Sequence, residues 1–357
     1  MSNLKSKKII AGLLCLLLCA SGIFAAKKDT KAKSAPMPNW VTTPSDDYPY
    51  SKYFTSVGYD RNRDMAELKA CEGIASIFSQ SVKSSTKASS RMVQAESEGH
   101  VSTAKVSSLN QDILRDVDAA DLIAVEIKGA WKDENEGVWY TIAVLDKAKA
   151  QDIYTQMIKQ NVEHIETLLG YETTDQYSFE VFAIYDFCQE IAAMNEGYLE
   201  RLRVINTGAA DSLKPLCQSS KELKLKALDI AKQIPIATVV EGDVDGRVRA
   251  AFASAITKAG FRSSTNPNER YVLTVKVVWT PSKTTDGSSV RCDYSISGGL
   301  KDNGIDEELM PVSIKGRGSD VDQARAQQKA LGNIEKKDVG SKFSSDFDKY
   351  LKSITVD

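Results

Sequence analysis

Six residues occur twice in this chain, in the same order and at a constant offset of 260 positions (318 − 58). In both places the repeated residues follow a segment with the side-chain alternation of a strand and begin a segment with the apolar spacing of a helix. The glycine would end the strand, the aspartate would lie where the helix dipole favours a carboxylate, and the alanines would let the helix pack closely on a sheet. The repeat therefore predicts the same sheet-and-helix unit near both ends of the chain. The matched sets are Gly58, Asp60, Ala66, Lys69, Ala70, Ile74 and Gly318, Asp320, Ala326, Lys329, Ala330, Ile334.

The first unit is predicted to occupy residues 38–146. Apolar side chains recur at helical spacing from Arg61 to Val82. The Ser-rich residues 83–110 are expected to form a frayed helix end and an irregular edge strand. Alternating side chains predict strands at 53–58, 122–131 and 138–145, the last two joined by a polar turn at 132–137.

The middle of the chain, residues 147–233, carries three apolar stripes at helical spacing. Gly170 is the predicted C-cap of the first helix, and the second helix is expected to end near Gly208. Amphipathic helices of this kind must bury their stripes against each other or against a partner. We therefore expect a helical segment between two units that contain sheets.

Residues 234–357 return to strands and helices, and two hairpin turns are predicted at Asp286-Gly287 and Asn303-Gly304. The chain is 42% hydrophobic and 26% charged, which excludes a disordered protein. The predicted fold class is α+β, with two small sheet-and-helix domains flanking a helical segment. The elements expected here are strands at 234–240, 271–279, 290–296 and 312–314, a helix at 248–259, and a closing helix at 321–351 broken near Gly340.

The first 26 residues have the pattern of a secretory signal peptide. Three lysines precede an apolar run from Ile9 to Leu18, and small residues at Ala25 and Ala26 offer a cleavage site. Cys19 is an alternative site of lipid attachment, although Leu18 stands where a lipoprotein signal has a small residue. Residues 27–37 are predicted to be a solvated tether whose four lysines could also touch anionic lipid or a cell-wall polymer.

Four cysteines lie beyond the signal: Cys71, Cys188, Cys217 and Cys292. In an exported chain they could form two disulfides, and Cys188–Cys217 is the pair to test first. Each also lies within an apolar pattern, which favours small buried hydrophobic residues instead.

Motifs for known chemistry are incomplete in this sequence. Asp243-Val244-Asp245-Gly246 begins like a calcium loop but lacks its later ligands, so we interpret Asp245 as a helix cap. Gly316-Arg317-Gly318 lacks the remaining parts of a phosphate-binding loop and is interpreted as a strand-to-helix turn.

Candidate catalytic and metal-binding residues are equally few. The chain has two histidines, which exclude a multi-histidine metal site, and Cys188 with His164 is the single pair considered as a nucleophile and base. With 46 basic and 48 acidic residues, no global positive field attracts nucleic acid. Trp131, Trp139 and Tyr140 gather near one hairpin, where they could contact a glycan or a partner but more simply pair within a core.

Several segments of residues 38–150 resemble the Lpp-twenty family of bacterial envelope lipoproteins. They are Pro38-Asn39-Trp40, Asp46 to Tyr50, Phe54 to Tyr59, the helix with Ala66 and Ala70, and Val138 to Asp146. Residues 234–354 are similar in pattern to α/β modules of envelope assembly proteins, among them curli-secretion, penicillin-binding-protein-activator and flagellar-collar proteins. The resemblance implies a non-enzymatic protein of the periplasm or outer membrane.

Three functional hypotheses follow. The first is an exported envelope protein with a binding or scaffolding role, without catalytic, cofactor-binding or metal-binding residues, whose partners are envelope proteins or cell-wall components. The second is a subunit of an outer-membrane secretion or flagellar assembly, in which sheet edges and helical stripes mediate oligomer formation. The third is a cysteine-dependent enzyme, which would need a thiol of low pKa. Membrane attachment through Cys19 stays open.

Overall fold

The computed structural model describes residues 36–96, 123–172, 175–243, 245–283 and 289–354, and for residues 80–96 and 283 the backbone alone. The chain divides after Met37, and every element below belongs to the unit that begins at Pro38. The predicted signal peptide, the tether with its lysines, Cys19 and the Asp286-Gly287 turn lie outside the described residues.

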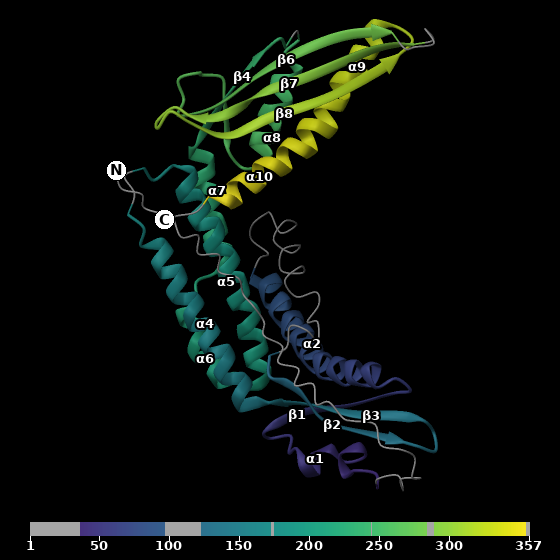
Figure 1. Ribbon diagram of the computed structural model, residues 1–357. Coiled ribbons are helices and arrows are strands. Elements are labelled where there is room, and N and C mark those ends of the chain that lie inside the picture. The colour runs from purple at the N-terminus through teal and green to yellow at the C-terminus, as the bar shows by residue number, and fades with distance from the viewer. Residues whose placement is uncertain (1–35, 97–122, 173–174, 244, 284–288, 355–357) are drawn as a thin grey trace, which may run out of the picture. The chain divides into compact units, whose positions relative to one another are not determined.

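The first part of the unit, which we call the N-terminal module, is an antiparallel three-stranded sheet with helix α2 (Arg63–Glu96) packed on one face (Figure 1). The strand order is β1-β3-β2, so β3 is central. Short helices η1 (Asn39–Val41) and α1 (Pro44–Asp47) precede the sheet. The strands are β1 (Tyr53–Asp60), β2 (Val125–Asp133) and β3 (Val138–Asp146).

Helix α2 is longer than the sequence predicted. The Ser-rich stretch after Val82 continues the helix to Glu96 instead of fraying. It also contains Lys, Ala, Arg, Met and Gln, which favour helix and offset the serines. The predicted edge strand falls partly on this helix and otherwise on residues 97–110, which lie outside the described residues.

Four helices, which we call the connector, follow β3. Their N-termini are capped by the side chains of Asp146, Ser178, Asn206 and Ser219, each of which accepts from a backbone N–H of the first turn. Gly170 is the C-cap of the first helix, as predicted. The helices are α4 (Lys147–Leu169), α5 (Phe179–Ile205), α6 (Thr207–Leu213) and α7 (Ser220–Gln233), with a 3₁₀ turn η3 (Lys214–Leu216) after α6.

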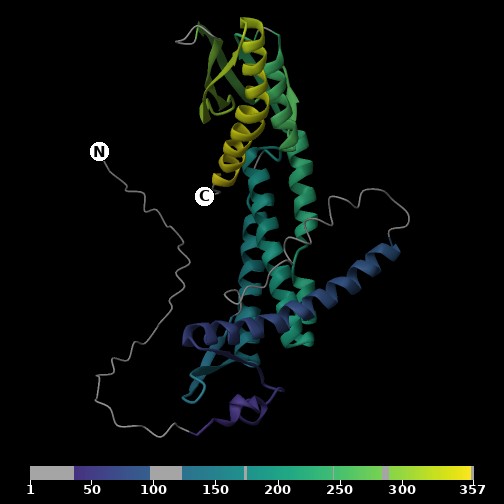
Figure 2. The same ribbon diagram turned by 90° about the vertical axis from the view of Figure 1, so that its right-hand side faces the viewer.

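Helix α5 ends at Ile205, before the predicted stop near Gly208, because Asn206 leaves helical geometry and caps α6. Figures 1 and 2 show α5 beside α4 and α7, in agreement with the extensive contacts that it makes with each of them.

The last part, the C-terminal module, contains a five-stranded mixed sheet of order β5-β4-β6-β7-β8. Strands β5, β4 and β6 are parallel, whereas β6, β7 and β8 form antiparallel pairs. The strands are β4 (Pro235–Glu241), β5 (Arg262–Ser264), β6 (Tyr271–Lys283), β7 (Val290–Asp302) and β8 (Glu307–Asp320), and the helices are α8 (Arg247–Lys258), α9 (Gln323–Asn333) and α10 (Ser344–Ser353).

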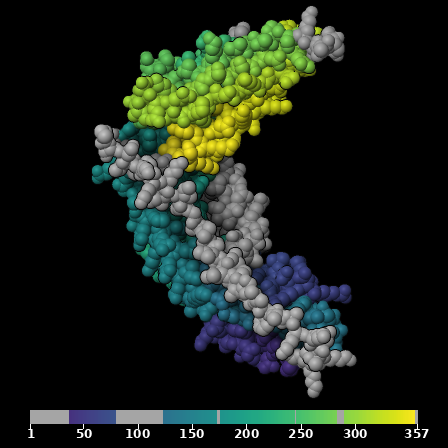
Figure 3. Space-filling model, viewed as in Figure 1, coloured from purple at the N-terminus to yellow at the C-terminus, as the bar shows by residue number. Residues whose placement is uncertain are grey.

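One face of this sheet packs on the helices and the other faces solvent. Leu273, Val275 and Val277 of β6 are buried, while the alternate residues Lys276 and Val278 are exposed. Atoms of β7 and β8 form part of the molecular surface in Figure 3. The turn predicted at Asn303-Gly304 lies between β7 and β8, as expected.

The closing helix is not interrupted at Gly340. A π-helical segment, η4 (Ile334–Phe343), joins α9 to α10. A Cβ atom on Gly340 would lie 2.5 Å from the carbonyl oxygen of Glu335, so the wide turn brings backbone where a side chain would stand. The glycine therefore permits a change of helical pitch in place of the predicted break.

The repeat predicted from the sequence is present in three dimensions, and we call it the strand–helix joint. A Cβ atom on Gly58 would lie 2.1 Å from the carbonyl oxygen of Ala66, and one on Gly318 would lie 2.2 Å from that of Ala326. Ala66, Ala70, Ile74 and their counterparts 260 positions later are all fully buried. Each glycine therefore lets a helix rest directly on a strand backbone.

Two details of the joint differ from the prediction. The glycines lie inside their strands, which continue to Asp60 and Asp320. These aspartates pair with Lys69 and Lys329, at 2.6 and 2.8 Å. The helix starts are instead capped by the equivalent residues Asn62 and Asp322, whose side-chain oxygens accept from backbone N–H groups at 2.8 and 2.9 Å.

The joint relates larger parts of the two modules. β1 is an edge strand beside β3, and β8 is an edge strand beside β7. If β1 and α2 are placed after β3, the order β2-β3-β1-α2 matches β6-β7-β8-α9 with the same antiparallel neighbours. The modules therefore share one arrangement in two chain orders, and the α+β class is confirmed.

Candidate functional surfaces and cavity

Three aromatic side chains form a row across the N-terminal sheet, on the face opposite α2. The strand register pairs Tyr59 with Tyr140, and Tyr140 with Trp131. Their ring centres are 6.1 and 5.6 Å apart, and successive ring planes are inclined by 31° and 39°. Tyr59 is 63% exposed and the other two are half-buried. We call these three residues the aromatic row.

Trp131 and Tyr140 pair across the strands as predicted, but none of the three hairpin aromatics belongs to a hydrophobic core cluster, so the prediction that they lie within a core is wrong. Trp139 lies on the opposite face from the row, with the Arg63 guanidinium 5.7 Å and the Lys132 ammonium 6.0 Å from its ring. The hairpin end of the sheet therefore presents aromatic rings on both faces.

Trp40 extends the aromatic surface next to the row. A Cβ atom on Gly129 would lie 3.1 Å from the Trp40 ring, so this ring rests on the glycine backbone of β2. Gly129 pairs with the fully buried Ile142, one pleat away from Tyr140. Trp40 thus covers the sheet beside the row.

The basic side chains near the aromatic rings of this sheet are paired with carboxylates. Lys69 lies 6.0 Å from the Tyr59 ring centre and pairs with Asp60 at 2.6 Å. On the face opposite the row, Lys132 lies near Trp139 and pairs with Glu134 at 3.1 Å. The pKa of Asp60 is lowered by the backbone N–H of Asn62 and then by Lys69, so the carboxylate stays charged beside its lysine.

The C-terminal module has no aromatic residue at the corresponding positions. The joint offset aligns Tyr59 with Ser319, whose strand partners are Arg291 and, beyond it, Ser282. The same sheet arrangement is therefore built with small and charged residues at the place where the N-terminal module carries its aromatic row.

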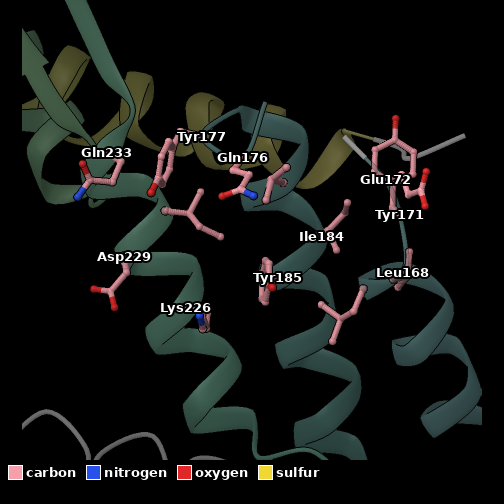
Figure 4. A pocket seen from close by; sticks show the side chains of 13 residues that line it. Leu168, Tyr171, Glu172, Gln176, Tyr177, Ile184, Tyr185, Lys226, Asp229 and Gln233 are labelled. Atoms are coloured by element: carbon pink, nitrogen blue, oxygen red, sulfur yellow. The ribbon is translucent and has the colours of Figure 1, made fainter. Parts of the chain in front are cut away.

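A cavity of about 890 Å³ opens among α4, α5 and α7. Its wall contains Leu168, Ile184 and Ile230, and the rim includes the exposed rings of Tyr171 and Tyr177. Figure 4 shows Tyr185 and Ile184 of α5 between Leu168 of α4 and the polar side chains Lys226 and Asp229 of α7. The volume lies within the range of roughly 300–1,000 Å³ found for small-molecule sites. No cysteine or histidine lines the cavity.

An ion cluster joins the connector to the C-terminal sheet. Asp302 is 1% exposed, and its carboxylate accepts two hydrogen bonds from Arg270 Nε, at 2.9 and 3.0 Å, and one from Arg270 Nη2 at 2.7 Å. Arg270 also pairs with Asp175. The hydrogen bond to Asp302 raises the pKa of Arg270 above its ordinary value. The cluster is fully paired and its role is structural.

The predicted cap at the start of α8 is made by a different residue. Asp243 accepts from the backbone N–H groups of Val248 and Arg249 at 3.2 and 2.8 Å, whereas Asp245 accepts only from Arg247 at 3.4 Å. Gly246 has a positive φ of 75°, which turns the chain so that Asp243 reaches the helix start. The Asp243 carboxylate is thereby occupied by backbone donors.

The Gly316-Arg317-Gly318 segment lies inside β8 and is not a strand-to-helix turn. A Cβ atom on Gly316 would lie 2.2 Å from the Tyr294 hydroxyl, and Gly318 lies under the α9 backbone. Both glycines therefore serve close packing, and no loop is formed there to hold a phosphate.

The cysteines and His164 are not brought together. Cys71, Cys188, Cys217 and Cys292 are all free thiols, so the Cys188–Cys217 disulfide is not formed. Burial raises the pKa of all four thiols, that of Cys188 to about 11. Cys188 is fully buried in the connector core, whereas His164 is exposed on α4. A nucleophile and base pair is not present at these residues.

Within the described ranges, no group of three or more His, Cys, Asp or Glu residues is arranged to hold a metal ion. In the same part of the chain, no helix has both the length and the hydropathy to cross a bilayer. The sequence did not predict the aromatic row, because the row depends on a strand register that joins distant segments.

No family model matches this chain, and no curated protein matches it by sequence. Among solved structures, the secreted protein HP1454 from Helicobacter pylori is similar at 14% identity and a TM-score of 0.47, over 85% of this chain and 99% of that one.

Smaller proteins match one part of the chain. A minor lipoprotein from Acinetobacter baumannii is similar at 13% identity and a TM-score of 0.25, over 34% of this chain and 91% of its own. The PelC dodecamer from Paraburkholderia phytofirmans gives 19% identity and a TM-score of 0.22, over 30% of this chain and 86% of its own. Values this low carry no information on activity, partners or location.

Proposed function

We propose that this chain is an exported protein of the bacterial envelope that acts by binding and scaffolding, without catalysis. The observation that carries the proposal is that one helix, α5, belongs to the cores of both modules. Its first turn contributes Phe179 and Phe182 to the C-terminal core, and its last turns contribute Leu199 and Leu202 to the N-terminal core.

Contacts at both ends of α5 are extensive. At one end the Phe179 ring stacks on Tyr271 at 3.9 Å, and the Phe179 backbone N–H donates to the Tyr271 hydroxyl at 3.2 Å. Near the other end Tyr198 lies 5.9 Å from Tyr154, a fully buried residue of α4. A helix that is shared in this way suits a protein that presents two binding modules from one body.

The titratable groups support a role without catalysis. The thiol pKa values are raised, which disfavours the reactive thiolate. Hydrogen bonding to Lys128 and then to Lys149 lowers the pKa of Glu126 to about 2, which keeps it ionised in a surface pair. The Tyr294 hydroxyl is bonded to Asp338 of η4. The Glu126–Lys149 and Tyr294–Asp338 contacts link neighbouring elements, and burial accounts for the raised thiol pKa values.

The export step rests on the signal-like pattern of residues 1–26. The resemblance of residues 38–150 to the Lpp-twenty lipoproteins is part of the same proposal. Mature chains that begin near Ala26 would indicate cleavage by the general signal peptidase, and chains that begin at an acylated Cys19 would indicate an anchor in the membrane.

The proposal is tested by fractionating a bacterial host that expresses the full chain, with mass spectrometry of the mature N-terminus and crosslinking in intact cells. We expect a shortened chain in the envelope fraction, crosslinked to envelope components. A variant that lacks residues 2–26 is the matched control and should stay in the cytosol. A full-length chain recovered solely from the cytosol, or turnover of a small substrate by the purified protein, would contradict the proposal.

A further inference from the structure

We propose that the outer edge of strand β1 is a docking site for an extended segment of another polypeptide, which adds a fourth strand to the N-terminal sheet. The inference deepens the proposed function and rests on it, because it names the kind of partner that the N-terminal module binds. The strand order β1-β3-β2 leaves β1 at one end of the sheet. Among the residues that the structure describes, no strand pairs with its outer side.

Backbone donors and acceptors on this outer side are unused in the middle of β1. The N–H of Tyr53 donates to a carbonyl of the preceding turn at 3.0 Å, and the carbonyl of Tyr59 accepts from Lys69 Nζ at 3.3 Å, so neither group points to β3. Alternate residues of a strand direct their N–H and C=O groups to the same side. Thr55 and Val57 therefore also point these groups outward, where they have no hydrogen-bond partner within the described ranges.

β1 lacks the features that protect the other sheet edges. Native proteins keep edges from pairing by means of short strands, lysines, prolines and bulges. β5 has three residues, β2 has Lys128 beside a register shift, and β8 has Pro311, Lys315 and a register shift. β1 has eight residues, without lysine, arginine or proline and without a register shift against β3. Of the four edges of the two described sheets, that of β1 is therefore the one left open to a further strand.

The aromatic row also stops at this edge. Trp131 and Tyr140 are half-buried, whereas Tyr59 has a neighbouring strand on one side alone and is 63% exposed. On the face that carries α2, Met65 is 44% exposed. It lies four residues before Lys69, so it is on the side of the helix from which Lys69 reaches the edge. An added strand would place side chains beside Tyr59 on one face and beside Met65 on the other.

A second copy of this chain does not fit through the same edge. The α2 backbone lies directly on Gly58 of β1, where a Cβ atom would be 2.1 Å from a helix carbonyl oxygen. Two β1 strands paired antiparallel about a two-fold axis would carry their α2 helices on the same face, about 4.8 Å apart. Packed helices need about 8–10 Å between their axes. The occupant is therefore a strand with no helix lying on it.

The occupant that fits is an extended segment that is unstructured until it binds. Main-chain hydrogen bonds to Thr55 and Val57 would supply affinity, and alternate side chains would supply selectivity. On the face of the aromatic row, an aromatic or β-branched side chain beside Tyr59 would continue the cross-strand packing. The charged pair at the end of the edge, Asp60 with Lys69, is already matched at 2.6 Å, so the edge requires no net charge in its partner.

The test uses the purified full chain without its predicted signal and the end-blocked peptide Thr-Val-Thr-Tyr-Thr-Val-Thr, followed by isothermal titration calorimetry. Two control peptides of the same sequence carry N-methyl groups, one on the threonine amides and the other on the valine and tyrosine amides. Alternate N–H groups of an added strand face β1. We therefore expect one methylated peptide to lose binding and the other to keep most of it. Binding through side chains alone would not depend on which set is methylated.

Amide hydrogen exchange followed by NMR locates the bound peptide on the unaltered chain. The N–H groups of Thr55 and Val57 should exchange more slowly when the peptide is bound. Absence of binding, equal losses with both methylated peptides, or protection elsewhere without protection at these two residues would overturn the proposal. A dimer that forms without peptide and protects the same two amides would also overturn it, in favour of a second copy.

Two variants test the edge from the side of the protein. Thr55→Pro removes one outward N–H, which an edge strand tolerates, and should weaken peptide binding by about fivefold or more. Tyr59→Ala should weaken it by several-fold through lost side-chain packing. Phe187→Ala is the matched control, because Phe187 is 54% exposed on α5 and distant in sequence from the edge. Equal affinity of Thr55→Pro, folded by circular dichroism, and this control would contradict the proposal.

A separate readout distinguishes this inference from the proposed function. Tyr59→Ala should reach the envelope fraction as the unaltered chain does. An unaltered chain found in the envelope that fails to bind the peptide would refute the docking edge and leave the export proposal standing. A chain confined to the cytosol that binds the peptide at Thr55 and Val57 would refute export alone.

Discussion

The two modules share a joint and differ in the surface that they build on it. In both, a glycine without Cβ lets a helix rest on an edge strand, and a lysine of that helix returns to an aspartate at the strand end. On the opposite face one module carries Tyr59, Tyr140 and Trp131, and the other carries serines and Arg291. Residues common to both modules are those that the fold requires, and residues that differ are available for function.

The same comparison applies inside the cores. Thr141 of β3 pairs with Gly58, and Cys292 of β7 pairs with Gly318, so they occupy corresponding places beneath the helices. Both are buried, but the Thr141 hydroxyl has no hydrogen-bond partner among the residues that the structure describes. The C-terminal module fills this place with a thiol, which is less costly to bury.

The largest expected effect comes from adding one carbon to either joint. Gly58→Ala and Gly318→Ala would place Cβ 2.1 and 2.2 Å from helix carbonyl oxygens, so each helix must move away from its sheet. We expect each change to destabilise the protein by about 3 kcal/mol, at the upper end for overpacking. Urea unfolding followed by circular dichroism measures this, and hydrogen exchange should locate the opening in the altered module.

Gly332→Ala is the control for both joint variants. Gly332 is also a helical glycine, but a Cβ atom there meets nothing within 4 Å. This substitution should stabilise α9 by up to about 1 kcal/mol, through helix propensity. If all three glycine variants unfolded at the same urea concentration, the two joints would not have the close contacts described.

The next largest effect is expected at Asp302, a buried residue of the C-terminal module without a counterpart pair in the N-terminal joint. Asp302→Ala would leave Arg270 with a single carboxylate partner, Asp175, and remove a fully buried acceptor. We expect a loss of about 2–3 kcal/mol, less than for a fully buried pair because Arg270 is 30% exposed. Thermal unfolding measures it. Asp229→Ala, at an exposed pair on α7, should change little, and equal losses in both variants would contradict this role for Asp302.

Much of this fold could be predicted from local sequence patterns. The errors of that prediction also have local causes. Alternation predicted the central parts of β6 and β7, and apolar side chains at helical spacing predicted helices in the connector, with Gly170 as the C-cap of the first. The C-terminal part of β8 was missed because Gly316 and Gly318 were interpreted as a turn. In the structure these glycines admit the Tyr294 ring and the α9 backbone, which a single sequence does not display.

The candidate site was less accessible to prediction than the fold. Tyr140 and Trp131 belong to one hairpin, and their grouping was visible in the sequence. Tyr59 joins them only because β1 pairs with β3 in the register that sets Tyr59 opposite Tyr140. Such long-range pairing depends on the whole sheet. The resulting register places the three rings in an exposed row and not in a core.

A smaller effect is expected from exchanging the residues beneath the joints. Thr141→Val removes a buried hydroxyl without a partner and keeps the side-chain shape, so it should stabilise the protein by about 1 kcal/mol. Cys292→Thr places a hydroxyl in the corresponding buried position and should be destabilising. The urea midpoints of the two variants measure these changes in stability. A loss of stability in Thr141→Val would show that the hydroxyl makes a hydrogen bond.

The smallest effect concerns the two lysine–aspartate pairs, and it distinguishes joints that otherwise look alike. The pKa of both aspartates is lowered, but the first cause for Asp60 is the Asn62 backbone N–H, and for Asp320 it is Lys329. Lys329→Met should therefore raise the pKa of Asp320 more than Lys69→Met raises that of Asp60, while the backbone N–H groups of Val321 and Asn62 keep both values lowered. Carboxyl carbon chemical shifts followed through a pH titration measure both values.

The sign of the accompanying stability change follows from linkage. A carboxyl whose pKa is lower in the folded chain stabilises the fold above its ordinary pKa, and this contribution is lost as the pH falls through the folded value. Lys329→Met should therefore flatten the acid side of the pH–stability profile more than Lys69→Met does. If the two variants flattened it equally, the lysine would contribute equally to both aspartates, and the two joints would be electrostatically equivalent.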